Sequence, residues 1–162
     1  MLNIRPATLD DLGQITEIYN DAIKKTTATF DTEPKTLEQQ ESWFASHDAG
    51  HPVLVAEETG LVLAWASLSQ WSDRCAYSET AEISLYVKEE NRRKGIGKQL
   101  MVAAIRAGKE AGLHTIIARI AGSNKVSADL CKSFGFQYIG TMREVGKKFG
   151  NLLDVHLMQL IY

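Results

Sequence analysis

Cysteine is scarce in this chain of 162 residues, and long apolar runs are missing. Its two cysteines, Cys75 and Cys131, lie far apart and outside any C-x-x-C pattern, which argues against a disulfide framework. Such cysteine usage is typical of a reducing compartment, so we expect a cytoplasmic location. No apolar run approaches the ~18 residues that a membrane span needs, and no charged and apolar leader opens the chain, so neither spanning nor export is expected.

An excess of charge of one sign is also missing. The 18 Lys and Arg residues against 20 Asp and Glu give a formal net charge of −2, which argues against general binding of nucleic acid or membranes. His47, His51 and His114 have no spacing typical of a metal site, so we predict no metal. With 44% hydrophobic and 23% charged residues, the composition predicts one compact domain over residues 1–162.

The most informative stretch is residues 80–100, which predicts a strand, a basic loop and the start of a helix. Residues 80–88 alternate strictly between apolar and polar, a period of two that predicts a strand with one buried and one polar face. Two glycines follow among four cations: Gly95 and Gly97 with Arg92, Arg93, Lys94 and Lys98. From Ile96 onward the apolar residues have helical spacing.

This basic glycine loop has the chemistry of a phosphate site. The first amides of a helix lack intrahelical partners and lie at the positive end of its dipole, and glycines let phosphate oxygens approach the backbone. Arg and Lys add charge-assisted hydrogen bonds. Two common phosphate loops fit badly, because Gln99 stands where a Walker loop has Ser or Thr, and Leu100 where a dinucleotide fingerprint has its third glycine.

The loop RRKGIG at residues 92–97 matches R-x-x-G-x-G, the signature of the GCN5-related N-acetyltransferases (GNAT), which this chain resembles. Further motifs are similar to the branch of phosphinothricin and methionine sulfone N-acetyltransferases, and they cover nearly the whole chain in order: Phe30-Asp31-Thr32-Glu33-Pro34, Trp71 with Arg74 and Tyr77, Thr80-Ala81-Glu82, Asn124, Gly135-Phe136, and Phe149-Gly150-Asn151 with Asp154 and Gln159. The resemblance implies acetyl-CoA as cosubstrate and a small-molecule amine as acceptor.

The order of elements predicts an α+β domain with a central mixed, mostly antiparallel sheet flanked by helices. Strands are expected at residues 2–7, 53–57, 61–68, 80–88, 114–121, 137–149 and 152–161. Helices are expected after Thr8 and Thr36, from Ile96 to about Gly112, and from a cap at Ser123 or Asn124 to Phe134. The resemblance implies the three-layer GNAT fold, in which the strands at 80–88 and 114–121 splay apart and admit the pantetheine arm of acetyl-CoA.

The resemblance also assigns residues to acetyl-CoA. A strand whose neighbour diverges has unpaired amides and carbonyls that a pantetheine amide can bind, and the matching positions are Leu85, Tyr86 and Val87. The phosphate positions are Arg92, Arg93, Lys94, Gly95, Ile96, Gly97 and Lys98. Asn124, Ser127 and Lys132 match further cofactor positions, although a helix cap and exposed side chains explain them nearly as well.

Acetyl transfer to an amine requires a proton acceptor, a stabilised oxyanion and a protonated leaving thiolate. Glu82 matches the glutamate proposed as base in this branch, and the alternative is an ordinary solvated or salt-bridged carboxylate. A backbone amide, with Val87 the first candidate, would bind the oxyanion. Relatives usually have His or Tyr where Cys131 stands, so the general acid is left open between Tyr86, Tyr138 and water, and the cysteine is interpreted as a small buried residue.

For the acceptor, the resemblance points to Phe30, Arg74, Tyr77 and Tyr86. Arg forms planar paired bonds to carboxylate or phosphinate, and aromatic rings shape a side-chain pocket. The alternatives are a surface arginine and a core phenylalanine. Many relatives that act on methionine sulfoximine and sulfone have a basic residue where Ser72 stands, which leaves the acceptor open.

The sequence therefore predicts an acetyl-CoA-dependent N-acetyltransferase acting on the α-amine of a small amino acid or an analogue such as phosphinothricin or methionine sulfoximine. Direct attack in a ternary complex is expected, because no activated Cys-His or Ser-His pair is visible. Relatives are commonly dimers, which implies a homodimer. Two alternatives remain, namely a catalytically idle acyl-CoA sensor and an acetyltransferase of proteins or peptides.

Overall fold

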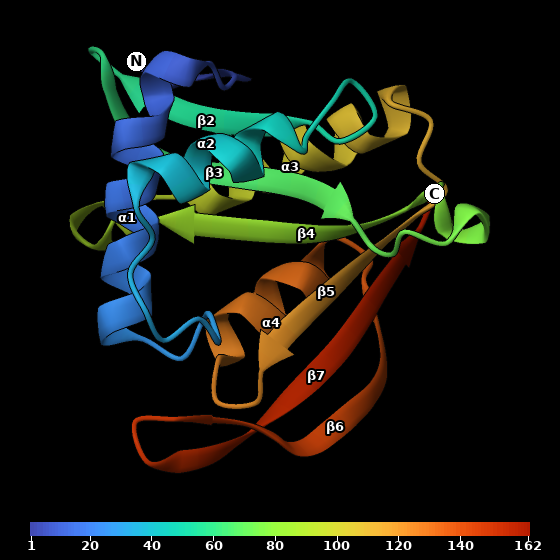
Figure 1. Cartoon of the computed structure of the whole chain (residues 1–162). Helices are drawn as coiled ribbons and strands as arrows, with labels where there is room; N and C mark the ends of the chain where they lie inside the picture. The colour runs from blue at the N-terminus through green and yellow to red at the C-terminus, as the bar shows by residue number, and fades with distance from the viewer.

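A computed structural model describes residues 1–162 and shows one seven-stranded sheet between layers of helices (Figure 1). The strands are β1 (Asn3–Pro6), β2 (Val53–Glu58), β3 (Leu61–Gln70), β4 (Thr80–Val87), β5 (Thr115–Ala121), β6 (Gln137–Lys148) and β7 (Asn151–Ile161). The helices are α1 (Leu12–Lys25), α2 (Leu37–Ala45), α3 (Ile96–Glu110) and α4 (Lys125–Ser133), with 3-10 turns at Leu9–Asp11, Cys75–Tyr77 and Glu89–Asn91.

The sheet order is β1-β2-β3-β4-β5-β7-β6, and every neighbouring pair is antiparallel except β4 and β5. This confirms the predicted α+β class and the mixed, mostly antiparallel sheet. No helix of the structure combines the length and apolarity that crossing a bilayer requires.

Local capping by side chains explains where α2 and α4 begin. At α2, the Gln39 amide donates to Thr36 Oγ1 at 3.1 Å and the Thr36 amide donates to Gln39 Oε1 at 2.9 Å, as the spacing predicts. At α4, Asn124 Oδ1 accepts from the Ser127 amide at 3.2 Å. Thr8 and Asp11 also form the predicted capping box, in which the Thr8 amide donates to Asp11 Oδ2 at 2.8 Å, and the 3-10 turn that follows Thr8 leads into α1 at Leu12. The three predicted capping residues therefore lie at the starts of helical segments, and the segment after Thr8 begins as a 3-10 turn rather than as an α-helix.

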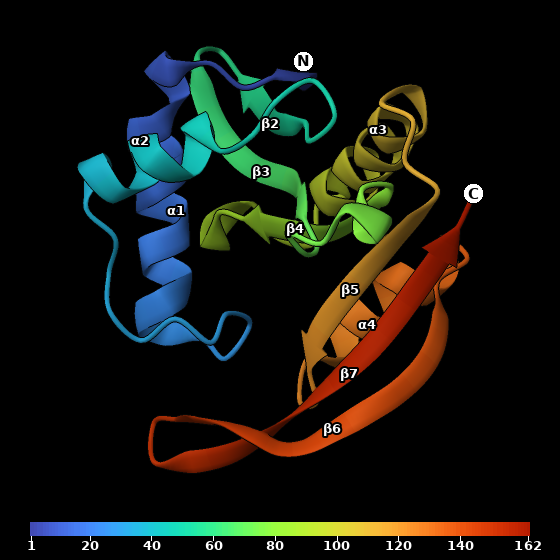
Figure 2. The same ribbon diagram turned by 45° about the vertical axis from the view of Figure 1, so that its right-hand side comes forward.

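Helices cover both faces of the sheet, so the face of residues 80–88 that we expect to be polar is only partly exposed. Figure 2 shows α1 and α2 on one side of β3 and β4, and α3 on the other. On the α1 side, the Tyr86 ring lies 5.1 Å from the Trp65 ring and 5.2 Å from the Tyr19 ring, measured between centroids. Glu82 and Ser84 lie on the same face of β4 and are partly exposed.

The sheet opens between its two central strands. β4 pairs with β5 only over three residue pairs, from Thr80↔Thr115 to Glu82↔Ile117. Beyond that point β4 stays paired with β3 up to Val87, and β5 stays paired with β7 up to Ala121, so the strands diverge without losing their other neighbours (Figure 1). This confirms the splayed central strands and leaves the facing edges of β4 and β5 unpaired.

Candidate active site

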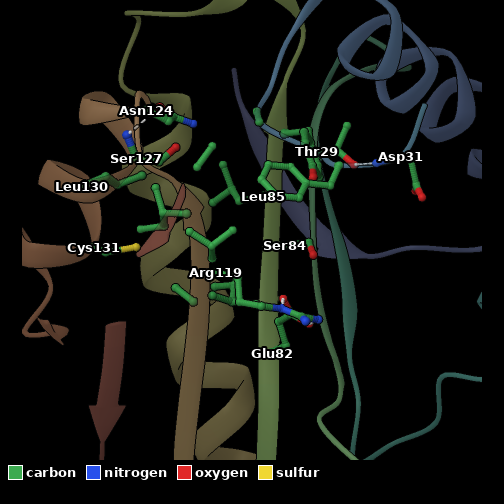
Figure 3. A pocket seen from close by; sticks show the side chains of 18 of the residues that line it. Thr29, Asp31, Glu82, Ser84, Leu85, Arg119, Asn124, Ser127, Leu130 and Cys131 are labelled. Atoms are coloured by element: carbon green, nitrogen blue, oxygen red, sulfur yellow. Dashed lines mark hydrogen bonds and ion pairs between the residues drawn. The ribbon is translucent and has the colours of Figure 1, made fainter. Parts of the chain in front are cut away.

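A cavity of about 490 Å³ lies where β4 and β5 diverge (Figure 3). Its walls come from β4, β5, α4, the hairpin of β6 and β7, and the loop that contains residues 28–31. Fifteen of its 22 lining residues are hydrophobic. Such a mostly apolar channel with a few convergent polar groups is typical of a site for an organic ligand.

The start of α3 has the geometry of an anion site. Gly95 precedes the helix with a φ of 80°, a left-handed conformation that suits glycine, and no side chain caps the first amides. The first intrahelical bond in this turn runs from the Gln99 amide to the Gly95 carbonyl at 3.2 Å. The amides of residues 96–98 therefore have no intrahelical acceptor and point out of the helix end.

Cations surround this helix start, and the loop lies directly against the cavity wall. The side chains of Arg92, Arg93, Lys94 and Lys98 are exposed. Arg92 Nε also donates to the Val87 carbonyl at 3.2 Å, which ties the loop to the end of β4. A Cβ built on Gly97 would lie 3.8 Å from Leu85 Cδ2 and 3.9 Å from Leu130 Cδ2, and both leucines line the cavity. The phosphate loop is therefore continuous with the channel.

The other residues assigned to the cofactor divide into two groups. Leu85, Tyr86, Asn124 and Ser127 line the cavity, the first two on the unpaired part of β4 and the last two on α4 and its cap (Figure 3). Val87 lies beyond the lining residues at the end of β4. Lys132 is exposed on α4 and does not line the cavity. Their roles in binding stay predictions.

Glu82 lies in the cavity and is paired with an arginine. Arg119 Nε and Nη2 donate to the two Glu82 carboxylate oxygens at 2.6 and 2.5 Å, and this bond raises the pKa of the guanidinium. The Arg119 guanidinium also lies over the Trp71 ring, 5.4 Å from its centroid. The base role of Glu82 stays a prediction, and the structure shows the salt-bridged arrangement that the sequence left as its alternative.

Sequence reasoning missed Arg119 as a site residue. It is the one charged residue in β5, whose other members are Thr115, Ile116, Ile117, Ala118, Ile120 and Ala121. A lone cation in a strand that is otherwise buried was the available signal. What could not be read from the sequence is the parallel register of β4 and β5, which sets Arg119 beside Glu82.

The loop between α1 and α2 forms another wall. The Tyr19 hydroxyl bonds the Thr29 hydroxyl at 2.9 Å and also donates to the Asp31 carboxylate. Thr29 and Asp31 line the cavity on the side of β4 that carries Glu82 and Ser84 (Figure 3). Burial raises the pKa of the neighbouring Tyr86 to about 12, so its hydroxyl is neutral at physiological pH and is a weaker acid than that of an exposed tyrosine.

The hairpin of β6 and β7 holds this loop in place. Buried Lys148 donates from Nζ to the Thr29 carbonyl at 2.8 Å, and burial lowers the pKa of its ammonium. Phe30, which lines the cavity, packs on Gly146 so closely that a Cβ there would lie 2.3 Å from Phe30 Cε2. The acceptor role of Phe30 stays a prediction, and its ring forms a wall rather than part of the core.

Cys131 is a buried cavity-lining residue. Cys131 is 4% exposed, and burial raises the pKa of its thiol to about 11. The thiol is therefore protonated at neutral pH. Tyr138, another candidate acid, is exposed and bonds the Thr141 hydroxyl at 2.6 Å outside the cavity lining. Of the tyrosines considered, Tyr86 is the one that lines the cavity.

Two residues predicted to contact the acceptor lie elsewhere in the structure. Arg74 and Tyr77 are exposed on the connection between β3 and β4, outside the residues that line the cavity. No group of three or more His, Cys, Asp or Glu side chains is placed to hold a metal ion, and the absence of a metal stays a prediction. The acceptor roles of Arg74 and Tyr77 likewise stay predictions.

Comparison with known proteins agrees with this geometry. The family model described as an acetyltransferase (GNAT) domain matches residues 4–157. The chain belongs to the GNAT family of acetyltransferases. This GNAT chain is 41% identical over 160 residues to the L-methionine sulfoximine/L-methionine sulfone acetyltransferase of Pseudomonas paraeruginosa, covering 98% of this chain and 93% of the relative. It is 37% identical over 158 residues to the phosphinothricin N-acetyltransferase of Streptomyces coelicolor, covering 95% and 92%.

Solved GNAT structures confirm the fold. A phosphinothricin acetyltransferase from Sinorhizobium meliloti in complex with acetyl-CoA matches with a TM-score of 0.95 at 33% identity, covering 99% of this chain and 88% of that one. An N-acetyltransferase from Staphylococcus aureus matches with a TM-score of 0.95 at 38% identity, covering 99% and 98%. The resemblance to the phosphinothricin and methionine sulfone branch is therefore confirmed.

Proposed function

We propose that this GNAT protein transfers the acetyl group of acetyl-CoA to the α-amine of a small amino acid or amino-acid analogue. The observation that carries the proposal is the end of the β4–β5 pairing at Glu82↔Ile117, which opens a cavity between a free helix N-terminus and a carboxylate. The relatives named above act on methionine sulfoximine, methionine sulfone and phosphinothricin, and this supports the choice of acceptor.

The cofactor would lie along the unpaired edge of β4. Its diphosphate would accept hydrogen bonds from the free amides of residues 96–98 and attract the surrounding cations. Its pantetheine amides would pair with the backbone of Leu85 and Val87, as an added strand pairs with a sheet edge, whereas the backbone of Tyr86 faces β3. Asn124 and Ser127 would contact it from the α4 side of the channel.

The acceptor amine would attack the thioester carbonyl directly. Glu82 would take a proton from the amine, and the backbone amide of Val87 would donate to the developing oxyanion. The collapsing intermediate would release a thiolate, which needs a proton. Tyr86, neutral and lining the cavity, is the donor that the geometry favours over Tyr138. A homodimer and a cytoplasmic location also belong to this proposal.

Release of free coenzyme A thiol tests the proposal. Purified protein with acetyl-CoA is assayed against amino acids and their sulfone, sulfoximine and phosphinate analogues, with 5,5′-dithiobis(2-nitrobenzoate) as the thiol reagent. We expect acceptor-dependent thiol release and an N-acetylated product by mass spectrometry. Tight acetyl-CoA binding without turnover of any acceptor would favour the idle sensor. Acetylated lysines or N-termini in an added protein mixture, with no small-molecule turnover, would favour an enzyme acting on proteins.

A further inference from the structure

Arg119 is the only cationic residue among those that line the cavity. The same lining contains two anionic residues, Glu82 on β4 and Asp31 on the loop between α1 and α2. An α-amino acid brings one ammonium and one carboxylate. A cavity with carboxylates and a single guanidinium therefore has the charges that complement such a zwitterion, and the guanidinium is the group for its carboxylate.

The position of Arg119 on β5 places its planar guanidinium beside Glu82, the proposed base. It follows the last parallel pair, Glu82↔Ile117, by two residues, so its side chain emerges on the same face of the sheet as Glu82. Figure 3 shows the two side chains meeting across the gap between β4 and β5. The Arg119 side chain is 50% exposed and that of Glu82 only 20%, so Arg119 is the partner that an entering molecule can reach.

The ion pair also poses a mechanistic problem. Each oxygen of the Glu82 carboxylate already accepts one hydrogen bond from the guanidinium, so the side of the carboxylate that faces Arg119 is closed to an amine. Glu82 must leave this pair, at least in part, to act as a base. A second carboxylate can replace it at Arg119 with little loss, because the guanidinium fork binds either carboxylate through the same two parallel bonds.

We propose that Arg119 binds the carboxylate of the amino-acid acceptor by releasing Glu82, which is then free to accept the proton of the acceptor's amine. This inference rests on the proposed function and narrows its substrate class to acceptors with a free carboxylate next to the amine. An amine without that group leaves Glu82 bound to Arg119 and reacts slowly. Arg74, which the sequence favoured for the carboxylate, lies on an exposed loop outside the cavity.

The test compares two acceptors that differ only in the carboxylate. L-Methionine sulfone and 3-(methylsulfonyl)propylamine share a side chain, and the second lacks the carboxyl group. For the wild-type enzyme we expect kcat/KM to be at least about 50-fold higher for the sulfone, the order of size of a bidentate charged pair. In Arg119→Gln the sulfone should lose about 30-fold or more in kcat/KM. The amine should lose nothing and should react faster than with the wild type, because no guanidinium then holds Glu82.

Further variants separate recognition from folding. Arg119→Lys keeps the charge but not the planar fork, so we expect an intermediate loss for the sulfone. Arg106→Gln, an exposed arginine of α3 paired with Glu110, is the matched control and should behave as wild type. Calorimetric affinity for coenzyme A reports whether each variant is folded. If Arg119→Gln does not fold, Arg119→Lys and the wild-type comparison of the two acceptors decide the matter.

The outcomes distinguish this inference from the proposed function. If the wild-type enzyme acetylates both acceptors equally well, or if Arg119→Gln slows both by the same factor, the inference is overturned while the acetyltransferase activity stands. If the wild-type enzyme acetylates neither of them nor any amino acid of the wider panel, the proposed function itself fails. Loss confined to the sulfone, with coenzyme A affinity unchanged, supports the inference.

Discussion

The proposed phosphate site belongs to one continuous stretch of chain, the end of β4 and the loop to the start of α3, next to the cavity. The proposed acceptor end of the cavity is assembled from β4, β5, the loop after α1 and the hairpin of β6 and β7. At the phosphate end the binding groups are mainly backbone amides and glycines, which few substitutions can change. At the acceptor end they are side chains such as Glu82, Arg119 and Phe30. Within this fold, the acceptor can therefore vary more easily than the cofactor.

Glu82→Gln changes the acceptor end of the cavity and should have the largest effect on the rate of acetyl transfer. Loss of the base should lower kcat about 10²- to 10⁴-fold, while affinity for acetyl-CoA changes by less than about threefold. Steady-state kinetics over pH 6–9 and calorimetry measure the two effects. Glu79→Gln, at an exposed position before β4, is the matched control. An unchanged pH–rate profile in Glu82→Gln would reject the assignment of the base.

Gly97→Asp changes the proposed phosphate site at the start of α3. A carboxylate at the start of α3 repels the diphosphate, so the Kd for coenzyme A should rise about 100-fold by calorimetry. Gly97→Ala is the matched control, because its Cβ would lie 3.7 Å from Val87 Cγ2, an ordinary contact distance, and adds no charge. If both variants bind coenzyme A alike, the phosphate does not lie at this helix start and the comparison of the two ends breaks down.

Cys131→Ala tests whether the wall of the cavity is closed to water at Cys131, whose thiol is buried and uncharged at neutral pH. Its thiol pKa is about 11 in the folded protein and 9.0 as the ordinary value. The unfolded chain therefore loses the proton first, and the wild-type protein loses stability as the pH rises from about 9 to about 11.

The substitution removes this titration. The free energy of unfolding of the wild type, minus that of Cys131→Ala, should fall by roughly 2–3 kcal/mol over that window. Urea unfolding of both proteins between pH 8 and pH 11 gives this difference. A difference that stays constant with pH would mean that the thiol is not enclosed as the structure shows.

Gly146→Ala should have the smallest effect, confined to the acceptor end. The new Cβ would collide with the Phe30 ring at 2.3 Å and displace it, so KM for the acceptor should rise about 3- to 10-fold without a change in coenzyme A affinity. Gly140→Ala on the same strand is the matched control, since no atom lies within 4 Å of its Cβ. Equal kinetics in the two variants would show that Phe30 does not shape the acceptor pocket.

The strands and helices were predictable because their signals are local. The strand expected at residues 80–88 is Thr80–Val87, and the helix expected after the Thr36 cap is Leu37–Ala45. Alternation, caps and turn glycines act over a few residues, so the sequence contains them explicitly. The family resemblance added the splayed strands, which no periodicity contains.

The acceptor end was predicted less well, because its contacts join distant parts of the chain. The Glu82–Arg119 pair spans 37 residues, and the bond from Lys148 to Thr29 spans 119. The placement of Arg74 and Tyr77 outside the cavity depends on the path of the loop between β3 and β4. Neither the Glu82–Arg119 pair nor the bond from Lys148 to Thr29 produces a spacing pattern that can be recognised in a single sequence.

The order of elements, the basic glycine loop before a helix and the carboxylate on the preceding strand could all be read from the sequence, since each depends on neighbouring residues. Which charged side chains meet in the cavity, and which faces of the sheet are covered, depends on how distant segments pack together. The register of β4 against β5 explains this. Glu82 lies opposite Ile117 in the last parallel pair, so Arg119, two residues further along β5, is on the same face within reach of Glu82, and the packing of distant segments fixes that register.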